Sequence, residues 1–192
     1  MVWHSNLCVV SAHLSWNAER AFPYLEREAI LLDSINLRST PTVAYVPALL
    51  PSYEASQHRV VERSREILER RVAEAGARLI THATPVESAR DAQRAYEELG
   101  KVDLVILQSA TFAMGDVVLP FAEAGHAICL WAPSEPRRHG PIPLNGFVAM
   151  HLHTGVLRRA NLADAPFVTW LFGDAGEPLF EGRLAAVLNA VR

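Results

Sequence analysis

The chain has 192 residues, half of them hydrophobic, and a formal net charge of -3. This size and composition suit one domain with a sizeable core and exclude a largely disordered chain. No basic block or basic stripe interleaved with aromatic residues is present, so we expect no nucleic-acid partner. The N-terminus lacks the pattern of a secretory signal, and no apolar run approaches the length of a membrane span. Only two cysteines are present, Cys8 and Cys129. We therefore expect a cytoplasmic protein without membrane contact.

The first forty residues stand apart from the rest of the chain. Residues 7–14 could form an extra edge strand, and residues 17–37 carry apolar side chains at helical spacing. We interpret residues 1–40 as an N-terminal helical extension that packs on the main domain or on another subunit.

Residues 41–192 alternate between strand-like and helix-like segments. Apolar runs rich in β-branched residues predict five strands, at residues 42–50, 77–83, 103–107, 126–131 and 167–171. Helical spacing predicts helices at residues 54–75, 84–99, 115–124, 144–159 and 178–191. Strands that alternate with covering helices favour a three-layer, doubly wound α/β domain with a parallel sheet. The simplest strand order is the flavodoxin-like one, 2-1-3-4-5.

Ligands of such sheets bind beyond the carboxyl ends of the strands. Here those ends are residues 48–56, 108–115 and 131–145, and the last of them is a long loop rich in proline, arginine and glycine. The candidate substrate-binding residues at these ends are Tyr53, Ser109, Phe112 and Trp131. Trp131 ends an apolar run, so it fits the core and the stacking wall of a sugar-sized pocket equally well.

No complete catalytic set is visible in the sequence. The chain has no GxGxxG or GxxxxGK[ST] phosphate loop and no GxSxG elbow. Glu54 and Asp116 are the candidate acid/base pair, because they follow strands that are neighbours in the predicted order; surface or capping roles are the simpler alternative. The histidines nearest to one another are His139, His151 and His153. On a helix, residues two apart point about 200° from each other, so we expect no metal site there.

Residues 102–136, VDLVILQSATFAMGDVVLPFAEAGHAICLWAPSEP, resemble the amino-terminal domain of the L-fucose isomerase and L-arabinose isomerase superfamily. In that domain a strand is followed by a T-[FY] loop, a D-x-x-x-P helix and a strand that ends in L-W-x-x-P. The downstream segments PLNGFVAMHLHTGVLRR and FVTWLFGDAGEP look like the family's Asn-Gly helix and its Gly-Asp turn. The likeness spans about residues 42–192, whereas the first forty residues have no clear counterpart.

The resemblance implies the first domain of an aldose-ketose isomerase-like system. Members of the family use a divalent ion, usually manganese, whose ligands belong to later domains that this chain lacks. Their first domain forms oligomer contacts and lends loop residues to a neighbouring subunit's active site. By this resemblance residues 49–53, Phe112 and Trp131 would face the neighbour's sugar, and no metal ligand is carried over. A homo-oligomer, or a partner chain with the missing domains, would then complete the isomerase site.

Two alternatives remain open. The chain could be an independent enzyme that acts on a small polar substrate at the strand ends, with catalysis by Glu54 and Asp116. It could also be a non-catalytic protein that binds a sugar or another small molecule.

Overall fold

The protein is described by a computed structural model that covers residues 40–137, 139–162 and 168–191. The strands are β1 (Thr42–Ala48), β2 (Arg78–Thr81), β3 (Leu104–Ser109), β4 (Ala127–Ala132) and β5 (Val168–Phe172). All neighbouring strands are parallel, and their order is β2-β1-β3-β4-β5. The predicted flavodoxin-like order is therefore confirmed. The predicted N-terminal extension lies, up to residue 39, outside the described residues.

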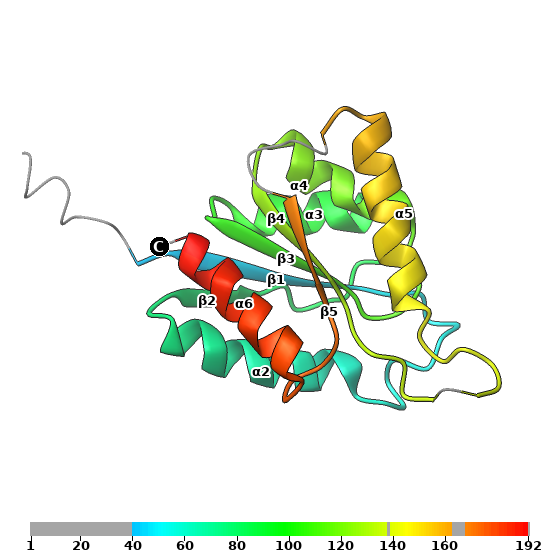
Figure 1. Ribbon diagram of the computed structural model, residues 1–192. Coiled ribbons are helices and arrows are strands. Elements are labelled where there is room, and N and C mark those ends of the chain that lie inside the picture. Colours follow the sequence, from blue (N-terminus) through cyan, green and yellow to red (C-terminus); the bar gives the residue numbers. More distant parts are fainter. Residues whose placement is uncertain (1–39, 138, 163–167, 192) are drawn as a thin grey trace, which may run out of the picture. The chain divides into compact units, whose positions relative to one another are not determined.

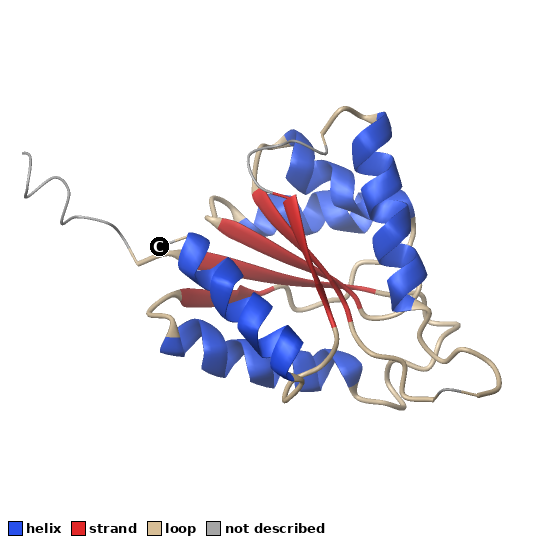
Figure 2. Ribbon diagram, in the orientation of Figure 1, coloured by secondary structure: helices blue, strands red, loops and turns tan. Residues whose placement is uncertain are grey.

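Helices cover the sheet on both faces and give three layers (Figure 1, Figure 2). They are α2 (Val60–Glu74), α3 (Ala89–Leu99), α4 (Leu119–Glu123), α5 (Gly146–Arg159) and α6 (Pro178–Ala190), with the 3-10 helix η2 (Gly115–Val118) before α4. Helices α2 and α6 cover one face, and α3, α4 and α5 cover the other (Figure 1). Every residue of β1 and β3 is buried, as expected for central parallel strands that are covered twice.

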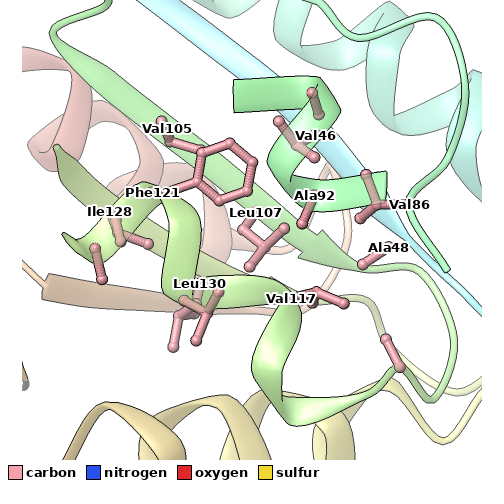
Figure 3. Close-up of a cluster of buried hydrophobic side chains, with 14 of the residues drawn as sticks. Val46, Ala48, Val86, Ala92, Val105, Leu107, Val117, Phe121, Ile128 and Leu130 are labelled. Carbon is pink, nitrogen blue, oxygen red and sulfur yellow. The ribbon is translucent and has the colours of Figure 1, made fainter. Parts of the chain in front are cut away.

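The core consists of two clusters, one on each face of the sheet. Figure 3 shows the first, in which Val105 and Leu107 of β3 meet Phe121 of α4. In the second, Ile106 of β3 and Trp131 of β4 lie among side chains of α2 and α6. The alternation of side chains along each strand therefore divides one apolar run between two cores.

Four helices begin later than the sequence pattern predicts: α4 begins at Leu119, after the 3-10 helix η2, α5 begins at Gly146, and the delay is longest for α3 and α2. The predicted helix 84–99 begins at Ala89, because Ser88 is its N-cap and its hydroxyl accepts a hydrogen bond from the Asp91 N–H. Val86, inside the predicted helix, instead forms a parallel bridge with Ala48. The predicted helix 54–75 begins at Val60, and turns occupy residues 51–59 before it. For α3 and α2 the residues taken for a first helical turn belong to the carboxyl edge of the sheet.

No helix in the described part of the chain combines the length and the apolar character that crossing a membrane requires.

Candidate functional site

The loops that follow β1, β3 and β4 are joined by backbone hydrogen bonds at the carboxyl edge of the sheet. The Glu54 N–H donates to the Pro143 carbonyl at 3.0 Å, so the loop after β1 holds the loop after β4. The Phe112 N–H donates to the Leu144 carbonyl at 2.7 Å and holds the same loop from the side of β3. The long loop after β4 is thus held close to both neighbouring loops.

Two of the predicted ligand-binding residues lie side by side at this edge. The rings of Tyr53 and Phe112 stack with their centroids 6.2 Å apart and their planes 30° apart, and both side chains are half-buried. The Asn145 side-chain amide donates to the Tyr53 hydroxyl at 3.4 Å. We call Tyr53, Phe112 and Asn145 the rim. Together they place two aromatic rings and one amide at this edge, groups that suit a small polyhydroxylated ligand.

Asn145 is a rim residue that the sequence reasoning did not select. It is the N-cap of α5 and has a φ of 58°, a left-handed conformation that asparagine tolerates better than most residues. The Glu135 carboxylate accepts hydrogen bonds from the N–H groups of Leu144 and Asn145, at 3.0 and 2.6 Å. The Asn-Gly pair before an apolar helical run was the available signal for this turn.

Ser109 lies inside the protein, not on the rim. Its hydroxyl is 3.4 Å from Nδ1 of His153, and Nε2 of that ring is 3.1 Å from the Met114 carbonyl. A neutral imidazole with its proton on Nε2 satisfies both contacts. Burial lowers the pKa of His153 to about 4, against the raising effects of the Met114 carbonyl and the Asp116 carboxylate. Ser109 and His153 are both fully buried, so the pair joins the end of β3 to the middle of α5 inside the core.

The burial of His153 predicts a loss of stability on acidification. An unfolded histidine binds a proton below about pH 6.5, whereas folded His153 does so only near pH 4. The unfolded state therefore binds more protons in this window, and the free energy of unfolding should fall by up to about 3 kcal/mol between pH 6.5 and 4. We expect His153→Gln to flatten this part of the profile in urea titrations, and His151→Gln, an exposed control, to leave it unchanged. Equal profiles for wild type and His153→Gln would contradict the assignment.

The three candidate metal-ligating histidines do not form a cluster. His153 is buried while His139 and His151 are exposed, which confirms that His151 and His153 point to different sides of α5. Residues 40–137, 139–162 and 168–191 contain no group of three histidine, cysteine, aspartate or glutamate side chains placed to hold a metal ion.

The sequence allowed Trp131 to lie either in the core or in the wall of a pocket, and the structure places it in the core. The side chain has no exposed surface and lies among the rings of Tyr45 and Phe180, with centroid distances of 6.5 and 5.1 Å. Its indole N–H donates to the Gly173 carbonyl at 2.9 Å. Trp131 consequently ties β4 to the loop after β5 and does not reach the rim.

Glu54 and Asp116 lie in different settings. The Glu54 carboxylate accepts from the Arg137 guanidinium at 3.1 and 3.2 Å and lies 3.3 Å from Nε2 of His58. Asp116 is exposed on η2, and no contact between described residues joins it to Glu54. Glu54 therefore anchors the long loop through Arg137, and the structure does not bring the two carboxylates together as a pair.

Comparison with known proteins identifies no family. No protein-family model matches this chain, and the curated proteins contain no match to it. The resemblance over residues 42–192 to sugar isomerases accordingly remains a prediction.

Proposed function

We propose that the chain acts as the first domain of a fucose/arabinose isomerase-like system and lends pocket-wall residues to an active site that a partner completes. The observation that carries this proposal is the rim, where the stacked Tyr53 and Phe112 rings and the Asn145 amide lie half-exposed at the carboxyl edge. Aromatic faces pack against the apolar face of a sugar, and amides bond its hydroxyl groups. A wall of this kind positions a sugar without performing the chemistry.

An exposed apolar surface beside the rim supports the involvement of a partner. It starts directly after Asn145, where Phe147 and Val148 of α5 are 44% and 49% exposed. The Phe147 ring packs edge-on against Phe172 of β5, 5.1 Å away, and Phe172 is itself 40% exposed. Contiguous exposed apolar side chains are typical of interaction surfaces. A second copy or a partner chain that covers this surface would bring its own residues next to the rim.

The divalent metal that the family resemblance implies does not fit the described residues of this chain, because they contain no adequate group of ligands. We therefore assign no reaction step to a metal held here. In the proposed system the partner supplies the metal and the base, and the role of this chain is to orient the sugar and exclude water.

The test is an assay of manganese-dependent aldose-ketose exchange, with the chain alone and with the chain mixed with proteins encoded beside it. We expect turnover only in a mixture. Tyr53→Ala and Phe112→Ala should each raise the KM of the mixture about fivefold, since loss of a stacking face costs on the order of 1 kcal/mol. Tyr96→Ala is the matched control, because Tyr96 is another half-buried tyrosine but lies against His126 at the amino edge of the sheet.

Two results would overturn the proposal. Turnover by the chain alone, lost in Glu54→Gln or Asp116→Asn, would establish an independent enzyme. A sugar-dependent rise in melting temperature, without turnover in any mixture, would establish a non-catalytic binding protein.

A further inference from the structure

A separate pocket opens at the same edge of the sheet, on the side covered by α2. Its volume is about 120 Å³, and its walls come from the first turns of α2, the loop after β4 and the loop after β5. None of the rim residues lines it. The lining residues used below are Val60, Arg63, Ser64, Ile67, Leu144 and Asp174.

Arg63 and Asp174 carry opposite charges on two walls of this pocket. Among the described residues neither side chain forms an ion pair, and Arg63 makes only a long contact of 3.5 Å with the His58 carbonyl. Burial raises the pKa of the Asp174 carboxyl and so does the nearby charge of Glu177, whereas the positive charge of Arg63 and a backbone hydrogen bond from Ser134 oppose that rise. Within the described part of the chain, the pocket therefore has an unpaired cationic side chain and an unpaired anionic side chain in its lining, which could each accept one group of the same ligand.

Apart from the imidazole of His58, the rest of the lining is aliphatic or hydroxylic. Val60, Ile67 and Leu144 supply apolar surface, and the lining includes no phenylalanine, tyrosine or tryptophan ring on which a sugar could stack. Ser64 is a buried hydroxyl held in place by the Gln108 amide, which donates to it at 2.6 Å. The cation and the anion balance each other, so a phosphate drawn to Arg63 would be repelled by Asp174.

We infer that this pocket binds a small aliphatic zwitterion of the α-amino acid class, with its carboxylate on Arg63 and its ammonium group on Asp174. A guanidinium presents two parallel N–H donors that match a carboxylate, and a carboxylate accepts readily from an ammonium group. The aliphatic side chain of the ligand contacts Val60, Ile67 and Leu144. An engineered closed cavity of about 150 Å³ holds one benzene molecule; this pocket is smaller but open to solvent, so it suits only the smallest amino acids, such as L-alanine and L-valine. This site is independent of the sugar-binding role proposed above.

The test is calorimetric titration of the full chain with L-valine and L-alanine, compared with analogues that lack one charge. We expect L-valine to bind and to raise the melting temperature. N-acetyl-L-valine lacks the ammonium group and L-valinamide lacks the carboxylate, so both should bind at least tenfold more weakly. Arg63→Gln and Asp174→Asn should each weaken L-valine binding at least tenfold. Arg65→Gln is the control, because Arg65 lies on the same helix but pairs with Glu69 on the surface.

The outcomes that would overturn the inference are equally specific. They are failure of both amino acids to bind the folded chain, retention of binding by N-acetyl-L-valine, or unchanged L-valine affinity in a folded Arg63→Gln. Inorganic phosphate that competes with L-valine, and binds more tightly in Asp174→Asn, would show a plain anion site instead. If Arg63→Gln does not fold, Arg63→Lys keeps the charge without the planar fork and should still weaken L-valine binding; unchanged affinity in Arg63→Lys would contradict the paired contact of the guanidinium with the carboxylate.

Discussion

Trp131→Ala is expected to lower the free energy of unfolding by about 3–5 kcal/mol, the cost of emptying a large aromatic site in a packed core. The substitution removes the contacts with Tyr45 and Phe180 and leaves the buried Gly173 carbonyl without its indole donor. Urea denaturation followed by circular dichroism measures the change. Trp170→Ala is the matched control, because Trp170 is 49% exposed and stacks with Arg183, so it should cost about 1 kcal/mol or less.

The Trp131→Phe variant distinguishes a role of the Trp131 side chain in the core from a role in the pocket wall. It keeps most of the buried ring and loses the hydrogen bond to Gly173, so we expect a folded protein weakened by about 1–2 kcal/mol. Because the indole has no exposed surface, any sugar-dependent rise in melting temperature should persist in this variant. If the sugar-dependent rise in melting temperature disappears in a folded Trp131→Phe variant, the indole contacts the sugar and belongs to the pocket wall.

Gly146→Ala should cost about 3 kcal/mol or more, because an added Cβ would lie 2.4 Å from the Ser109 carbonyl oxygen. That atom belongs to the backbone of a central strand, so the start of α5 would have to move away from β3. The move would also displace Asn145 from the Tyr53 hydroxyl. Thermal and urea unfolding measure the loss, and it should be accompanied by weaker ligand binding at the rim.

Gly155→Ala is the control in the same helix. Nothing lies within 4 Å of the Cβ that it would add, and alanine is the better helix former, so the variant should be more stable by about 0.5–1 kcal/mol. Equal destabilisation by both substitutions would show that the close approach of α5 to β3 is not the cause.

Most of the fold could be predicted because its strands are locally distinctive. The run TVAYVPA is apolar throughout and becomes β1, buried on both faces. Helix starts were harder to predict, as Thr84 and Ser88 both have the side chain of an N-cap. Ser88 caps α3, because the residues just before it are drawn into the sheet edge by the pairing of Val86 with Ala48. A contact between segments far apart in the chain decided that boundary.

The candidate site could be predicted in part. Tyr53 and Phe112 follow neighbouring strands, and they lie together as strand order alone suggests. The pairing of Glu54 with Arg137 joins residues far apart in the sequence, and the long loop that carries Arg137 has no regular pattern from which its path could be read. The opposed charges of Arg63 and Asp174 were missed for the same reason.

By itself, the sequence determined the α/β class, the five strands and their order, because hydrophobic periodicity and the handedness of crossovers act locally or through simple topology. It also indicated which edge carries the loops of interest. Only the tertiary structure decided the direction of each side chain at that edge: Trp131 into the core, Ser109 towards His153, and Glu54 towards Arg137. Those directions depend on packing and hydrogen bonds between distant segments, which no local pattern encodes.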